Sequence, residues 1–144
     1  NIWSYFGRSN HLSIESEARL AQRGHLVELF LNNKYAGIYS MNEQLDRKQL
    51  KLNEDSGLLY KTTSWSDEIL FTGIDSEPDA SLFWEGYLLK YPDSPAEENW
   101  FPLYNLVHMT AYSSDEEFIN DIGSMLDINN AIDYWFLLFD LKLV

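Results

Sequence analysis

The chain has 144 residues, 45% of them hydrophobic and 15% aromatic, which is enough apolar material for one packed core and too much for a disordered segment. Ten basic residues against 23 acidic ones give a formal net charge of -13, which disfavours a nucleic acid or an anionic membrane surface and favours a cation or a basic partner. The absence of cysteine excludes disulfides and thiolate zinc sites. The longest apolar runs are far shorter than about 18 residues, so neither a membrane span nor a signal peptide is expected.

A β-hairpin is the clearest local structure in the sequence. Helix-forming residues over 14–22, followed by Gly24, first predict a short helix. The runs 25–31 and 35–41 are then rich in strand-forming residues, and the Asn32-Asn33 pair lies between them. Two such runs joined by a short Asn-rich turn predict a hairpin.

The rest of the first half is predicted to contain two further strands, 57–63 and 83–91. Residues 43–52 fit a helical turn followed by a short strand. Residues 64–82 are polar and contain Gly73 and Pro78, which predicts a loop or an irregular hairpin.

The pattern becomes helical from Ala96. Apolar and aromatic residues from Trp100 onward recur at helical spacing. Ser114 with Glu117 forms a capping-box sequence that opens a second helix to about Met125, and Asp127 can cap a third helix running to the end of the chain. This last helix is apolar nearly all round, which predicts that it is buried. A β-rich half followed by an α-helical half, with the change near residue 95, predicts an α+β fold.

Three segments resemble the CotH kinase family, the spore coat protein H-like atypical protein kinases. VELFLNNKYAGIYSMNEQLD (27–46) resembles the signature hairpin of the family, GLLYK (57–61) resembles its next strand, and NNAIDYWFLL (129–138) is similar to the helix that precedes its catalytic loop. The resemblance implies one partial domain of reduced protein-kinase-like architecture. Residues 1–95 would form a β-rich nucleotide lobe, and 96–144 would begin the helical lobe.

The resemblance also implies a function. Such a domain would transfer a phosphoryl group from ATP, with Mg²⁺, to Ser of a coat or surface protein that is expected to be basic. It would act outside the cytoplasm, at the cell surface, in the spore coat or after secretion. In the family the catalytic Asp and the Mg²⁺-binding residues follow the apolar helix that ends here at Val144, so the chain is expected to lack them. Asp133 and Asp140 are interpreted as helix-surface carboxylates, and no catalytic residue is assigned.

Three residues are candidates for the nucleotide pocket. Kinase chemistry needs a Lys on the phosphates and a Glu that holds this Lys. Lys61 and Glu43 match the family positions for these roles, although a solvated Lys61 and a local ion pair of Glu43 with Arg47 or Lys48 are the structural alternatives. Tyr60 could stack on adenine or pack in the core. Because strand neighbours face opposite sides, Tyr60 and Lys61 reach one cleft only if the strand bends there.

A binding module without catalysis is the alternative function. The aromatic residues of the chain, among them Trp84, Trp100 and Tyr104, suffice for a core or for a platform that binds glycans or a protein. Metal binding is not expected, because His11, His25 and His108 are widely separated. The alternating acids Asp75, Glu77 and Asp79 lack the Gly and the closing Glu of a calcium loop.

Overall fold

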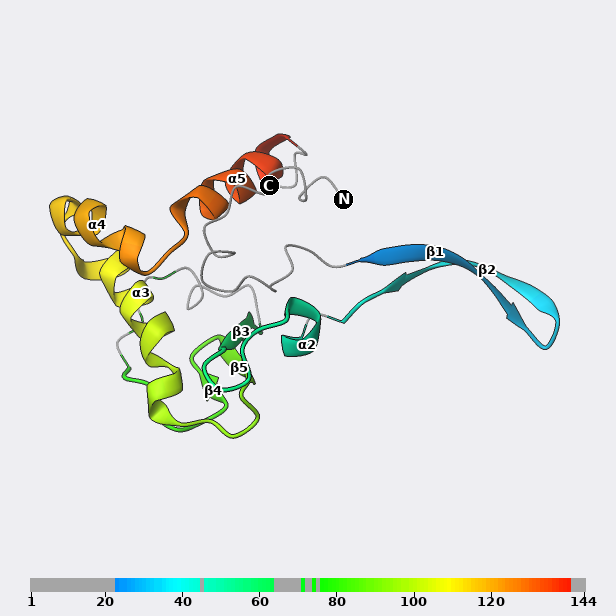
Figure 1. The fold of residues 1–144 in the computed structure, drawn as a ribbon, viewed down its shortest axis with the longest axis horizontal. Helices are drawn as coiled ribbons and strands as arrows, with labels where there is room; N and C mark the ends of the chain where they lie inside the picture. The colour runs from blue at the N-terminus through cyan, green and yellow to red at the C-terminus, as the bar shows by residue number, and fades with distance from the viewer. Residues whose placement is uncertain (1–22, 45, 64–70, 72–73, 75, 141–144) are drawn as a thin grey trace.

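The structure, a computed structural model, describes residues 23–44, 46–63, 71, 74 and 76–140. It confirms the α+β fold: two antiparallel sheets precede the main helices (Figure 1). The predicted helix over 14–22 lies outside the described residues. In chain order the elements are β1 Gly24–Leu31, β2 Lys34–Asn42, α2 Arg47–Leu50, β3 Leu59–Thr62, β4 Phe83–Trp84, β5 Tyr87–Tyr91, η3 Glu97–Asn99, α3 Phe101–Tyr112, α4 Asp115–Asp121, η4 Ile122–Ser124 and α5 Ile128–Asp140.

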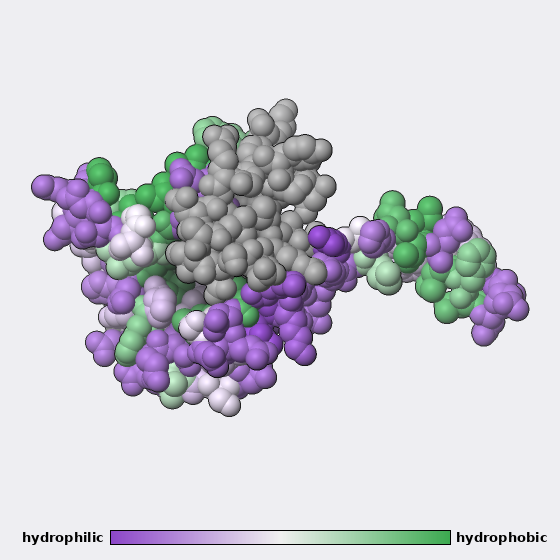
Figure 2. Space-filling model, viewed as in Figure 1, coloured by the Kyte–Doolittle hydropathy of each residue, from purple (hydrophilic) through white to green (hydrophobic). Residues whose placement is uncertain are grey.

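The predicted hairpin is confirmed as β1 and β2, which extend away from the rest of the described chain (Figure 1). Asn32 and Asn33 both have positive φ, 50° and 62°, as a tight turn between twisted strands requires. The pairing register shifts between Leu29 and Phe30, where β2 carries one extra residue. Figure 2 shows apolar patches on this hairpin. The exposed large apolar side chains are Leu26, Phe30, Leu31, Tyr35, Ile38, Tyr39 and Met41.

A short turn of helix connects the hairpin to the second sheet. Asp46 caps α2 by accepting a hydrogen bond from the Gln49 N–H at 2.7 Å. The helix ends at Leu50, and its C-cap residue Lys51 has φ 57°. The short strand predicted over the end of 43–52 does not form. Beyond it, the Asn53 side chain accepts hydrogen bonds from the backbone of Asp55 and Ser56, so the chain turns instead of extending.

The second sheet has the strand order β3-β5-β4. Residues 83–91 were predicted to be one strand, and this was wrong: they form β4 and β5, joined by a turn at Glu85 and Gly86. Glu85 has φ 49°, and Gly86 is buried at the turn. The single strand was predicted from composition, which does not show a turn that contains only one Gly.

The core lies between this sheet and α3. Trp84, Tyr87 and Leu89 of the sheet pack with Trp100, Leu103 and Val107, which lie at or within the first turns of α3. The Trp84 and Trp100 indole N–H groups donate to the carbonyls of Ser76 and Ser81 at 3.1 and 2.9 Å. The interpretation of these aromatic residues as core is therefore confirmed.

The two predicted helix starts of the last third are also confirmed. The Ser114 hydroxyl accepts from the Glu117 N–H, and the Glu117 carboxylate accepts from the Ser114 N–H at 2.9 Å. The Asp127 carboxylate accepts from the Asn130 N–H at the start of α5. The expected burial of α5 is wrong for Tyr134, Trp135 and Phe136, which are exposed, as are Ile132 and Phe139. No helix in the described part of the chain is both long and apolar enough to cross a membrane.

Candidate functional site

Lys61 lies on the outer face of the β3-β5-β4 sheet. The strand register places Lys61 opposite Leu88 and Leu88 opposite Phe83, so the three residues form one row across the sheet. Directly paired residues of antiparallel strands point to the same face. Lys61 is exposed, Leu88 is half-buried and Phe83 is 60% exposed. Arg47 and Glu54 form an ion pair, whereas Lys61 forms none with the described residues.

Tyr60 points to the opposite face of the same sheet, into the core. Its ring stacks on Trp100 with centroids 5.6 Å apart and planes 28° apart. Its hydroxyl donates to the Asn99 carbonyl, which belongs to the segment leading into α3. Burial raises the pKa of Tyr60 to about 12, and a backbone hydrogen bond opposes this shift in part. Stacking of adenine on Tyr60 stays a prediction, and it would have to use the ring face turned away from Trp100.

Glu43 closes the base of the hairpin. Its backbone N–H donates to the Arg23 carbonyl at 3.0 Å, and its carboxylate accepts from the Arg23 N–H at 3.0 Å. The same carboxylate oxygen accepts from the side-chain amide of Gln49 in α2 at 3.5 Å. Glu43 therefore connects the hairpin to α2. The expected ion pair with Lys61 is not among those formed by the described residues.

The structure therefore does not bring the three predicted residues together in one pocket. Tyr60 and Lys61 lie on opposite faces, as alternation along β3 requires. The pairing of β3 with β5 does shift between Leu59 and Tyr60. That irregularity does not turn Tyr60 out of the core, because its hydroxyl and its ring are held by Asn99 and Trp100.

A set of contacts near this sheet, between Arg47, Glu54 and Tyr91, was missed from the sequence. Arg47 lies over the Tyr91 ring, with its guanidinium carbon 5.2 Å from the ring centroid, and donates to Glu54 at 2.6 Å. The Tyr91 hydroxyl donates to the Glu54 carbonyl at 2.6 Å. These contacts hold α2 and the following turn against β5. The sequence suggested Arg47 only as a local ion-pair partner of Glu43, whereas Arg47 pairs with Glu54, and nothing in the sequence indicated a contact with Tyr91, 44 residues away.

The outer row offers a cation beside an apolar surface. A Lys ammonium binds phosphate as a point charge, and an exposed aromatic ring can stack on a base. Within the described ranges, no group of three His, Asp or Glu residues is placed to hold a metal ion.

The sequence matches the family model described as CotH kinase protein over residues 12–137. No curated protein and no solved structure matches the chain. The match covers most of the chain and includes the hairpin, both sheets and α5 up to residue 137.

Proposed function

Because the chain belongs to the CotH kinase protein family, we propose that it is the nucleotide-binding part of an ATP-dependent protein kinase. At the family level the domain is kinase-like. The proposal adds that residues 1–95 form the nucleotide lobe and 96–144 the start of the helical lobe. It also adds that the phosphoryl group goes to Ser of a basic coat or surface protein outside the cytoplasm.

The observation that carries the proposal is the row Lys61, Leu88 and Phe83. Neighbouring strands lie about 4.8 Å apart, so Lys61 and Phe83, two strands apart, are separated by about 10 Å at their backbones. An extended nucleotide lying across the strands would place its phosphates at the Lys61 ammonium and its base over Phe83 and Leu88. The local positive charge is needed because the whole chain carries -13. When Mg²⁺ is bound, it would neutralise further phosphate charge.

Glu43 has a second role in the proposal. A carboxylate that holds the phosphate-binding Lys is a general requirement of kinases. Glu43 would pair with Lys61 in the nucleotide-bound state and exchange its contact with Gln49, which at 3.5 Å is the longest of its hydrogen bonds described above. The contact with the Arg23 N–H would keep the hairpin base closed.

Nucleotide binding is the direct test, measured by calorimetry with ATP in the presence and absence of Mg²⁺. Lys61→Ala is expected to weaken binding by about tenfold or more, because it removes a charge that contacts phosphate directly. Lys34→Ala, which removes an exposed Lys from the hairpin, is the matched control and should bind like the wild type. A folded wild-type chain that binds no ATP would refute the proposal and leave the binding module without catalysis as the better account.

Binding of inorganic tripolyphosphate, measured in the same way, distinguishes the proposed role of Lys61 from that of Phe83. Lys61→Ala should weaken tripolyphosphate and ATP alike, since both present phosphates. Phe83→Ala should weaken ATP but not tripolyphosphate, because only ATP has a base to stack. If Phe83→Ala leaves ATP binding unchanged, the base does not lie on this face, and the ring of Tyr60 becomes the stronger candidate for adenine.

A further inference from the structure

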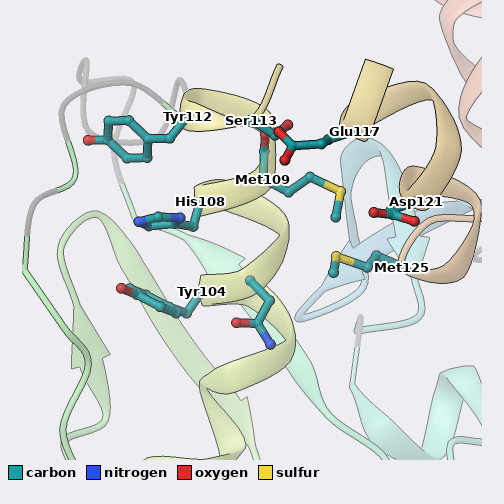
Figure 3. A pocket seen from close by; sticks show the side chains of 9 residues that line it. Tyr104, His108, Met109, Tyr112, Ser113, Glu117, Asp121 and Met125 are labelled. Carbon is teal, nitrogen blue, oxygen red and sulfur yellow. The ribbon is translucent and has the colours of Figure 1, made fainter. Parts of the chain in front are cut away.

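A groove lies along α3 where α4 and η4 pack beside it. Its volume is about 390 Å³. Figure 3 shows its two sides: Tyr104, His108 and Tyr112 line one, while Met109, Met125 and Asp121 line the other. None of these residues belongs to the row that contains Lys61. The groove is thus a second candidate site, which does not depend on the proposed nucleotide function.

The aromatic side of the groove is a ladder along α3. Tyr104, His108 and Tyr112 are spaced four residues apart and therefore share one helix face. Their ring centroids are separated by 5.5 and 4.7 Å. Tyr104 also contacts the buried Trp84, with centroids 5.8 Å apart, which ties the ladder to the core. A ligand would meet rings that are already held in place, so little conformational entropy is lost on binding.

The opposite side of the groove combines soft apolar groups with negative charge. The thioethers of Met109 and Met125 turn toward each other in Figure 3, and Asp121 lies beside them. Thioethers adapt to ligands of irregular shape. Glu117 also lines the groove, and its hydrogen bonds to Ser114 hold the pKa of its carboxyl below the ordinary value, so it stays ionised. No Lys or Arg is among the described residues that line the groove.

This chemistry selects a ligand with a positive end and an apolar stem. Arginine and lysine side chains have that form, because their methylene stems pack on apolar surface while the charged head stays at a polar edge. Aromatic faces attract the same cations. We propose that the groove binds a basic segment of a partner protein, with an arginine or lysine stem between Met109 and Met125 and its charged head at Asp121.

The charge of the chain argues for a partner of different composition. A second copy would also carry -13, with only ten basic residues against 23 acidic ones, so two copies repel each other. The helix that forms the groove wall adds to the negative field, since Asp115, Glu116 and Glu117 occupy its first turn. A basic segment is attracted to this surface from a distance, and the attraction weakens as salt is added.

The test uses fluorescence anisotropy with a short labelled peptide of alternating Gly and Arg, and the same peptide with Glu in place of Arg. The wild-type chain should bind the Arg peptide and not the Glu peptide. Asp121→Asn, which keeps the side-chain shape and removes the charge, should weaken binding about tenfold. Glu116→Gln is the matched control: it removes one charge from the same helix, but it does not line the groove. Met125→Gln should also weaken binding, because it makes the stem's surroundings polar.

The outcomes separate specific docking from general attraction. Equal losses for Asp121→Asn and Glu116→Gln would mean that only the overall negative field attracts the peptide, and the proposal would be overturned. Absence of binding by the folded wild type would overturn it as well. Since the readout does not involve ATP, failure here leaves the nucleotide proposal untouched, and Lys61→Ala should bind the Arg peptide as the wild type does.

Discussion

Replacing Trp100 by Phe tests whether the packing of the sheet on α3 is the main source of stability. Trp100 is 0% exposed, and its indole N–H donates to the Ser81 carbonyl at 2.9 Å. The smaller ring gives up about 1 kcal/mol through lost apolar burial and an unfilled space. The carbonyl without its donor costs about 1 to 3 kcal/mol, and the lower end applies because Ser81 is exposed enough for water to replace the indole. The expected loss in the free energy of unfolding is therefore about 2 to 3 kcal/mol.

Urea unfolding followed by far-UV circular dichroism measures this loss. The midpoint should fall while the slope stays constant, as for a change in stability alone. Trp135→Phe is the matched control, since it makes the same chemical change on α5 at a side chain that is 57% exposed. Its effect should stay within about 0.5 kcal/mol. If the two variants lose the same amount, Trp100 is not the centre of a packed core, and the derivation from burial and hydrogen bonding fails.

Two further predictions concern the buried phenol and the hairpin turn. The pKa of Tyr60 is raised from near 10 to about 12, so between these values the unfolded state releases the phenol proton before the folded state does. The contribution of protonated Tyr60 to the free energy of unfolding is therefore fully present below pH 10 and is lost as pH rises toward 12. Stability measured across that range should fall less steeply in Tyr60→Phe than in the wild type, and equal slopes would contradict the assigned burial. In the hairpin, Asn33→Val should lower the hydrogen-exchange protection of β1 and β2, because a β-branched residue is strained at φ 62°. Asn33→Gly should preserve it, and a hairpin that is equally protected in both variants would show that no positive φ is needed there.

Local signals in the sequence predicted the elements whose cause is local. The hairpin depends on two adjacent Asn residues that tolerate positive φ. α4 and α5 begin where the side chains of Ser114 and Asp127 accept hydrogen bonds from backbone N–H groups three residues later. Such contacts involve neighbours along the chain, so the residue types alone indicate them. The end of 43–52 shows the limit, since the sequence favoured a strand where α2 ends and its C-cap residue Lys51 has φ 57°.

The candidate site was predicted only as a set of residue types. The pattern of GLLYK placed Tyr60 and Lys61 on opposite faces of a strand, but it did not say which face meets the core. Tyr60 faces inward because Trp100 and Asn99, about 40 residues later, lie on that side. The partners of Lys61 in its row, Leu88 and Phe83, follow from the pairing of β5 with β3 and β4, which the prediction of one strand over 83–91 had excluded.

The sequence by itself determined the α+β class, the family, the hairpin turn and the helix caps, since each depends on composition or on residues a few positions apart. Only the tertiary structure decided that β5 lies between β3 and β4, that Tyr60 belongs to the core, and that Met125 and Asp121 line one groove together with the aromatic ladder of α3. The physical reason is the range of the contacts. Burial, strand order and grooves arise from segments distant in the chain, and their free energy depends on which surfaces meet.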